Sequence, residues 1–397
     1  MPISITRDAV QNFLLQFLGV VWDERFFWLP VVLALIFWKV WLYYIHASFI
    51  NGLSWTLFEI KLPREILKTP KAMEVVLNGL NITSDGNFLE KYWKGKLRPW
   101  FSLEIAGING GIHFFIYSQK FFKNLVEAQI YAQYPSVEII EVEDYTKISL
   151  RESFGREWAS WGTEFMLTKD DAYPIKTYVD YGLHETATKE EQKTDPLTAL
   201  LELMGSLKEG EQIWYQILIR ATKNKKWKDE AKMLVDEIMK RNEVSKGDDA
   251  KMGALMLSPG ERDVVQAIER DVSKLGYDVG IRAVYVAKKD KFNSINKPAI
   301  IGVMKQYNDA NLNGFRPSNA TGVDYFFVEK REAKLKKAMV DAFRQRSYFY
   351  MPYERKPFIL NTEELATIYH FPGKVAETPT FGRIEAKKSE PPATLPI

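Results

Sequence analysis

The stretch Trp100–Tyr117, WFSLEIAGINGGIHFFIY, decides how the chain folds. Two runs rich in aromatic and aliphatic residues flank a turn whose Asn-Gly-Gly sequence strongly favours a β-hairpin. Downstream, apolar residues on one stripe predict a helix over Gln119–Gln133, and Val137–Val142 follows as a strand. Upstream, Trp55–Leu62 is a further candidate strand. Residues 51–160 are therefore predicted to form one α+β module.

The C-terminal half of the chain shows a similar order of elements. Gln212–Ala221 and Asp278–Ala287 are predicted strands, and the charged residues from about 223 to 251 are a predicted helical insertion. The sequence Ser258-Pro259-Gly260-Glu261 is a capping box with proline at the first helical position, so a helix begins there. These elements predict a second α+β module over residues 161–372.

The two modules invite a common interpretation. A hairpin strand followed by a helix and a further strand suggests a ferredoxin-like α/β sandwich, and we predict one in each module. In this interpretation the strand–helix–strand unit that begins at His113 recurs as the unit that begins at Tyr215. The alternative is a chance likeness, because many α/β chains share such patterns.

The composition excludes several classes of protein. With a formal charge of +3, the chain is not a polycation that coats nucleic acid. It contains no cysteine, which excludes disulfides, thiolate metal sites and cysteine nucleophiles.

A search for catalytic patterns gives none. The pairs Gly95-Lys96 and Gly373-Lys374 lack both the earlier glycine and the following Ser or Thr of a phosphate-binding loop. The histidines show no short metal-ligand spacing, so we interpret them as structural: His46, His113, His184 and His370. We predict a non-enzymatic protein without catalytic, cofactor-binding or metal-binding residues.

A long apolar segment lies near the N-terminus, FFWLPVVLALIFWKVWLYYI at Phe26–Ile45. At a rise of ~1.5 Å per residue it is about 30 Å long, the thickness of a bilayer core. We predict a transmembrane helix over residues 26–48, after an amphipathic segment over residues 1–25; the alternative is a buried core helix. The predicted anchor residues are aromatic rings at both ends and a lysine that can snorkel to the surface: Phe26, Trp28, Lys39, Trp41, Tyr43 and Tyr44.

The distribution of basic residues predicts the orientation of this helix. Lys61, Arg64, Lys68 and Lys71 follow it, whereas only Arg7 and Arg25 precede it. Because cytoplasmic flanks carry the excess of Lys and Arg, we predict a single-pass protein of the inner (cytoplasmic) membrane with a large cytoplasmic C-terminal region.

A basic cluster is the candidate site for contact with phosphate or anionic lipid. Its members lie close together in sequence around a tryptophan: Arg220, Lys223, Lys225, Lys226 and Lys228. The alternative is a solvated helix face, because acidic residues intersperse the cluster.

The C-terminal stretch Phe358–Pro372, FILNTEELATIYHFP, begins a helix with the capping box Asn361–Glu364. A proline-rich segment, predicted to be a linker or tail over residues 373–397, follows it. This string resembles the segment that leads into the motor domain of HerA-like or coupling-protein-like ATPases of type IV secretion and conjugation. Other stretches, such as AQYPSVEIIEVEDY at Ala132–Tyr145, resemble the uncharacterised N-terminal region of such proteins in candidate-phyla bacteria.

The resemblance implies a role in a larger machine. It marks Asn361, Glu364, His370 and Pro372 as a pre-motor segment, and the motor itself is absent. We therefore expect a membrane-anchored accessory or N-terminal module that positions a cytoplasmic ATPase subunit, and we expect it to form a homo-oligomer. Direct contact with nucleic acid stays open. The alternative is a general membrane-anchored scaffold or interaction protein unrelated to secretion.

Overall fold

The computed structural model describes residues 15–16, 19, 22–63, 66, 68–148, 157–184, 194–239, 257–322 and 327–373. The chain divides into two compact units. The first consists of residues 1–53 with 85–97, and the second of residues 54–84 with 98–397. The predicted tail from residue 374 onward and most of the predicted segment 1–25 lie outside the described residues.

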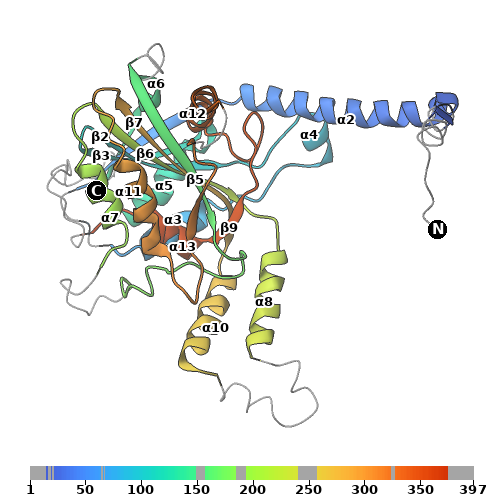
Figure 1. The fold of residues 1–397 in the computed structure, drawn as a ribbon. Coiled ribbons are helices and arrows are strands. Elements are labelled where there is room, and N and C mark those ends of the chain that lie inside the picture. The colour runs from blue at the N-terminus through green and yellow to red at the C-terminus, as the bar shows by residue number, and fades with distance from the viewer. Residues whose placement is uncertain are drawn as a thin grey trace, which may run out of the picture. The chain divides into compact units, whose positions relative to one another are not determined.

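Within the described residues, nine strands of the second unit form one antiparallel sheet (Figure 1). Their order is β4-β1-β3-β2-β6-β7-β5-β8, and β9 pairs with β7 off this path. The strands are β1 (Trp55–Lys61), β2 (Phe101–Ile108), β3 (Gly111–Gln119), β4 (Glu138–Val142), β5 (Trp158–Leu167), β6 (Glu211–Ala221), β7 (Gly276–Lys288), β8 (Phe315–Ser318) and β9 (Phe358–Asn361).

Helices cover both faces of the sheet. Those of the second unit are α3 (Lys71–Gly79), η1 (Lys120–Phe122), α5 (Lys123–Gln133), α6 (Tyr145–Ile148), α7 (Thr198–Gly205), α8 (Lys226–Ile238), α10 (Pro259–Val272), α11 (Asn296–Met304), η3 (Lys305–Tyr307), α12 (Val328–Arg344) and α13 (Thr362–Ile368). Helices α3, α5, α7, α11 and α13 contribute to the main core on one face. On the other face, α6 and α12 pack over a smaller cluster around Trp214 and Phe343. Because both faces are covered, the central strand β6 is buried along nearly all of its length.

The sheet consists of two halves that meet where β2 pairs with β6. If the strands of each half are numbered along the chain, both halves have the spatial order 4-1-3-2, namely β4-β1-β3-β2 and β8-β5-β7-β6. A helix connects strands 1 and 2 of each half, α3 or α7, and another connects strands 3 and 4, α5 or α11. The predicted α+β class is confirmed, and the boundary predicted at residue 160 falls inside β5 of one compact unit.

Two details of the predicted modules differ from the structure. The ferredoxin-like modules are not confirmed as separate sandwiches, because the halves form one continuous sheet. Their internal repeat also has a different register. The prediction matched β3 with β6, whereas the strand order places β6 where β2 lies in the first half.

The predicted hairpin turn connects β2 and β3 as expected. Ile108 pairs with Gly111, which leaves Asn109 and Gly110 as a two-residue turn. Both turn residues have positive φ angles, 53° and 85°, which asparagine and glycine adopt most readily. The turn predicted from the local sequence therefore agrees with the register of the β2–β3 hairpin.

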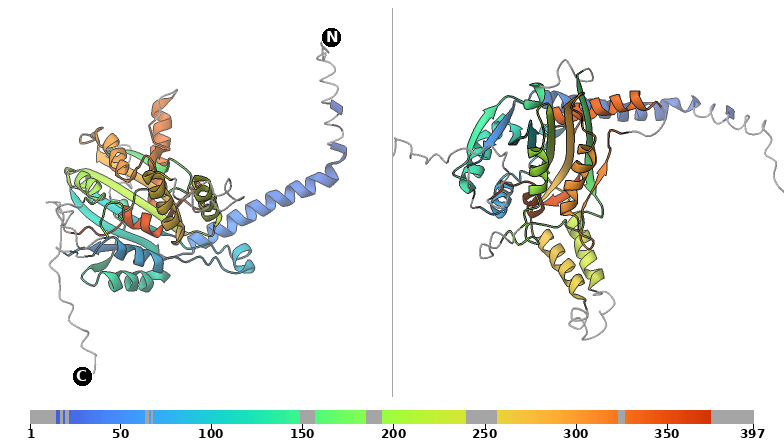
Figure 2. Two further views of the ribbon diagram at one scale, coloured as in Figure 1. Left: turned by 90° about the horizontal axis from the view of Figure 1, so that it is seen from below. Right: turned by 60° about the vertical axis from the view of Figure 1, so that its left-hand side comes forward.

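In the second half, α8 and α10 replace this turn. They lie between β6 and β7 and extend side by side away from the sheet (Figures 1 and 2). We call this helix pair the arm. The predicted capping box starts α10, with Ser258 and Glu261 exchanging hydrogen bonds. The residues that connect the far ends of the two helices, 240–256, lie outside the described part of the chain.

The first unit contains a long helix and a short one. Helix α2 (Arg25–Asn51) has 27 residues and includes the predicted apolar segment. Helix α4 (Phe88–Tyr92) lies in residues 85–97, which we call the α4 loop. Asn87 and Glu90 form a capping box that starts α4.

Candidate functional site

Helix α2 is the candidate membrane anchor. It is long and apolar enough to cross a membrane, and none of its most apolar window is buried against the rest of the chain. The alternative of a core helix is thus disfavoured, because a core helix would be covered. The predicted residues Phe26, Trp28, Tyr43 and Tyr44 are exposed, as is Lys39.

Trp41 is the predicted anchor residue that connects α2 to the α4 loop. Its indole Nε1 donates a hydrogen bond to the carbonyl oxygen of Tyr92, at 3.0 Å. The ring of Trp93 packs edge-on against it, with 5.7 Å between the ring centroids. Trp38 stacks on Tyr92 at 5.8 Å. The α4 loop is therefore fixed to the C-terminal part of α2.

Gly95 allows the chain of the α4 loop to approach α2 closely. It has a φ angle of +67°, which disfavours other residues. A Cβ atom at this position would collide with the main-chain carbonyl of Ile45. The loop thus runs along α2, with Tyr92 beside Trp38 and Gly95 beside Ile45.

The predicted basic cluster does not form one cationic surface. Arg220 makes an ion pair with Asp278 at 2.7 Å and stacks on Phe349. The Nζ atom of Lys228 donates to the carbonyl oxygen of Lys274 at 2.9 Å. The other three members are exposed: Lys223, Lys225 and Lys226. Two of the five cations therefore stabilise the fold.

The predicted pre-motor segment belongs to the core. All residues of β9 and α13 are buried, and so are His370 and Pro372. Asn361 caps α13 as predicted, since its side chain accepts from the amide of Glu364 and the Glu364 carboxyl accepts from the amide of Asn361, both at 2.8 Å. This segment is an internal part of the sheet unit.

An ion-pair network connects α13 to the base of the arm. Glu363 on α13 lies 3.1 Å from Nε of Arg270 and 2.8 Å from Nζ of Lys274. Lys274 also contacts Glu74 of α3 at 2.6 Å, and Arg270 contacts Asp180 at 3.1 Å. Glu363 is 1% exposed, and these two cations, together with a hydrogen bond donated by Thr177 Oγ1 at 2.6 Å, compensate its charge inside the protein.

Two carboxyl groups with raised pKa values lie beside this network, Asp271 and Glu364. Burial raises the pKa of Asp271 to about 7. Burial, together with the charge of Asp271, raises the pKa of Glu364 well above its usual range. Asn361 hydrogen-bonds to both groups. Such a pair suits acid–base chemistry when it faces a cleft, but it does not line either of the grooves described below.

The buried His370 has a carboxylate partner. Its Nε2 lies 3.1 Å from Oδ2 of Asp195, and its Nδ1 lies 2.9 Å from the carbonyl oxygen of Ala366. Burial lowers the pKa of His370, but the adjacent Asp195 carboxylate outweighs burial and holds this pKa above its ordinary value. This pair connects the end of α13 to the start of the segment that forms α7.

A polar row crosses the sheet under α12. Glu104, Gln216, Arg282 and Glu164 are successive cross-strand neighbours on β2, β6, β7 and β5, and all are buried. Arg346, after α12, donates from Nε to Glu104 at 2.9 Å. Gln216 donates to the same carboxylate at 2.9 Å. The row spans the junction between the two halves and joins them through charge-assisted hydrogen bonds.

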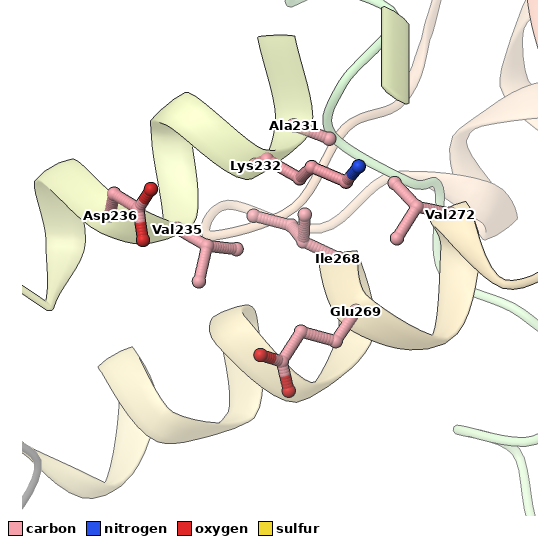
Figure 3. Close-up of a pocket in the computed structure, with 7 residues that line it drawn as sticks. All are labelled: Ala231, Lys232, Val235, Asp236, Ile268, Glu269 and Val272. Carbon is pink, nitrogen blue, oxygen red and sulfur yellow. The ribbon is translucent and has the colours of Figure 1, made fainter. Parts of the chain in front are cut away.

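The arm carries two grooves. Figure 3 shows the one between its helices, where Val235 and Ile268 form an apolar floor and Lys232, Asp236 and Glu269 supply charges. Its volume is about 210 Å³. A second groove of about 580 Å³ lies where the arm meets Tyr173 and its neighbouring loops. Both grooves are open to solvent, and charged and apolar side chains line each of them.

The comparisons place this fold in a family. A family model described as a domain of unknown function (DUF8128) matches residues 54–383. Because the match covers most of the chain, the chain belongs to this family. The match begins at Ser54, the first residue of the second compact unit. No curated protein matches the chain.

Sequence reasoning missed the α4 loop and the charged network. The loop has a signal, because FLEKYWKGK at Phe88–Lys96 alternates large apolar residues with lysines. The network has none, because Glu74, Arg270 and Glu363 are far apart in the sequence. Among the described residues, no group of three or more acidic or histidine side chains is arranged to hold a metal ion.

Proposed function

We propose that this protein is a non-enzymatic module anchored to a membrane by α2, which holds a cytoplasmic partner protein at the bilayer. The observation that carries the proposal is the exposed apolar helix α2. Removing such a surface from water is favourable by about 25 cal/mol per Å², and the hydrocarbon core of a bilayer is an apolar medium that can receive it.

The α4 loop supports the cytoplasmic orientation. Lys91, Lys94 and Lys96 are brought to the C-terminal part of α2 by the contacts of Tyr92 and Trp93. They add to the basic residues that follow α2 in the sequence, and an excess of lysine and arginine favours the cytoplasmic side.

The resemblance of the segment Phe358–Pro372 supports a more specific partner, an ATPase subunit of a type IV secretion-like machine. In this proposal the buried segment is a rigid base from which the chain continues toward the motor. The arm, which extends from the sheet, offers the partner a protein surface (Figure 2).

Anchoring is tested by charging the centre of α2. The double substitution Leu33→Glu with Ile36→Glu is expected to release the protein from washed membranes, because each central charge costs about 2.5–3.5 kcal/mol. The matched control is Met233→Glu on α8, which is exposed to a similar degree. A double variant that stays in the membrane fraction would overturn the anchor.

Orientation and partner require separate readouts. The chain lacks cysteine, so Met233→Cys gives one thiol on the arm. In intact cells an impermeant maleimide is expected to leave it unlabelled until lysis; labelling before lysis would place the arm outside. Site-specific crosslinking from the arm is expected to capture a HerA-like ATPase, and capture of other proteins alone would count against this partner.

A further inference from the structure

The α4 loop exposes an apolar surface that nothing in the described part of the chain covers. Phe88, Leu89 and Trp93 are 68%, 62% and 62% exposed. They lie on a helix of only five residues, started by its own capping box. Large apolar side chains that gather on a solvent-exposed surface in this way mark an interaction surface.

The position of this surface is set by α2. The hydrogen bond from Trp41 to Tyr92 and the stacking of Trp38 on Tyr92 fix α4 at the level of these two tryptophans. From there the loop continues toward Ile45, so α4 is the end of the loop nearer the apolar part of α2. In a bilayer, α4 would therefore lie at the same depth as Trp38 and Trp41.

The residues of the α4 loop and the tryptophans that contact it are of types that favour the headgroup level of a bilayer. Trp and Tyr side chains favour the headgroup level of a bilayer, and the contacts bring Trp38, Trp41, Tyr92 and Trp93 together. Three lysines accompany the apolar residues, Lys91, Lys94 and Lys96. Apolar and basic side chains in alternation are typical of helices that lie in the membrane interface.

We propose that the α4 loop is a second membrane contact, an interfacial element that inserts Phe88, Leu89 and Trp93 between the lipid headgroups. The occupant of this surface is the bilayer leaflet through which α2 leaves the membrane. Lys96 pairs with Glu90 at 3.1 Å and Lys91 with Asp85 at 3.6 Å, so Lys94 is the lysine that we assign to the lipid phosphates. The proposal rests on the proposed anchoring by α2 and adds the place where the anchor ends. It also positions Lys39 at the headgroup level, where its charge is solvated.

Single thiols test the proposal in the full chain, since the protein has no cysteine of its own. Leu89→Cys is labelled with an environment-sensitive fluorophore and reconstituted into phosphatidylcholine–phosphatidylglycerol vesicles. We expect blue-shifted emission, protection from aqueous iodide, and quenching by a spin label near the lipid headgroup. The matched control is Met233→Cys, because Met233 is 63% exposed and Leu89 is 62% exposed. Its label is expected to stay in water.

A third label separates this proposal from the anchor. Leu33→Cys lies about midway between Phe26 and Trp41 on α2 and reports only on the span. If Leu33 is protected and Leu89 is in water, the α4 proposal is overturned and the anchor stands. If both are in water, anchoring itself has failed, and the α4 proposal fails with it.

A substitution at Gly95 tests the geometry. Gly95→Val is expected to push the loop away from α2 and to lose the protection of the Leu89 label, while the Leu33 label stays buried. Circular dichroism reports whether the variant is folded. Protection of Leu89 that persists in a folded Gly95→Val protein would contradict docking of the loop on α2.

Discussion

The two halves of the sheet share a strand order and differ in how the chain leaves it. In the first half a two-residue turn joins β2 to β3, whereas in the second half the arm joins the equivalent β6 and β7. In the first half the connection from α3 to β2 contains the α4 loop, whereas in the second half the equivalent connection from α7 to β6 is short. The shared elements build the sheet, and the unequal connections carry the surfaces to which we assign contacts.

The comparison also shows what a long connection needs. The turn at Asn109 and Gly110 has the positive φ angles that these residue types adopt readily, and two hydrogen bonds connect Asn109 to Gly210 and Glu211. The arm is instead fastened at its base, where Arg270 and Lys274 neutralise Glu363 on α13. A projecting pair of helices therefore depends on charges in the core, and a turn does not.

Giving the second half the turn of the first is expected to have the largest effect. Ala221 pairs with Tyr277, so Asn-Gly between them would copy the turn of the first half. This graft removes Arg270 and Lys274 and leaves the buried Glu363 carboxylate with the hydrogen bond from Thr177 but without either cation, at a cost of about 3–5 kcal/mol. We expect it to unfold at a much lower urea concentration, and we expect Glu363→Gln to restore most of the loss. A graft as stable as the parent would show that the network does not fasten the arm.

The junction between the halves should be almost as sensitive. Glu104→Ala leaves Arg346 and Gln216 without their shared acceptor inside the protein. We expect a loss of about 3–5 kcal/mol in the free energy of unfolding, measured by urea denaturation in detergent. The control is Lys123→Ala, whose pairs with Glu127 and Glu141 are exposed at the sheet edge and are worth about 0–1 kcal/mol. Equal losses from the two variants would contradict the role of the row.

The carboxyl pair beside α13 predicts a dependence on pH. The pKa of Asp271 is raised in the folded state, so between about pH 4 and its folded value of about 7 the folded protein binds more protons than the unfolded chain. The stabilisation that protonated Asp271 gives the folded state is therefore present at low pH. It is lost as the pH rises through that window, on the order of 1 kcal/mol of unfolding free energy per pH unit.

Asp271→Asn removes the titrating group and keeps an acceptor for Asn361. The slope of unfolding free energy against pH is expected to become more positive across the window in this variant than in the parent. Parallel curves would show that Asp271 titrates the same way in both states.

The smallest effect is expected at the cap of the arm. Ser258→Ala removes the hydroxyl that accepts from the amide of Glu261 at the start of α10. Helix caps of this kind are worth about 1 kcal/mol. Amide hydrogen exchange should accelerate in the first turns of α10 and stay unchanged in β6 and β7. Faster exchange throughout the sheet would mean that the arm and the sheet unfold together.

Local signals account for what the sequence could predict. The Asn-Gly turn and the capping boxes at Ser258 and Asn361 each depend on residues within four positions, and each is found in the structure. The long apolar run of α2 is equally local. Four-residue strands such as β8 and β9 escaped prediction, because so short a run carries no periodicity.

Long-range partners account for what the sequence could not predict. Arg220 belongs to a basic run, yet its charge is satisfied by Asp278 across the sheet. Glu363 and Glu364 resemble solvated acids at a helix start, yet both are buried because α13 lies under α3. Only the fold brings the compensating cations to them.

The hydrogen bond between Trp41 and Tyr92 also bears on the length of α2 that would span the bilayer. Phe26 and Trp41 are fifteen residues apart on one helix, a rise of about 22 Å. A typical hydrocarbon core is about 30 Å thick, so a span that ends at Trp41 is short for it. Short spans thin the lipid around them or collect where the membrane is already thin. An α4 loop docked at the headgroup level would therefore limit the length of the span. It would favour the membranes, and the regions of a membrane, whose hydrocarbon core is thin.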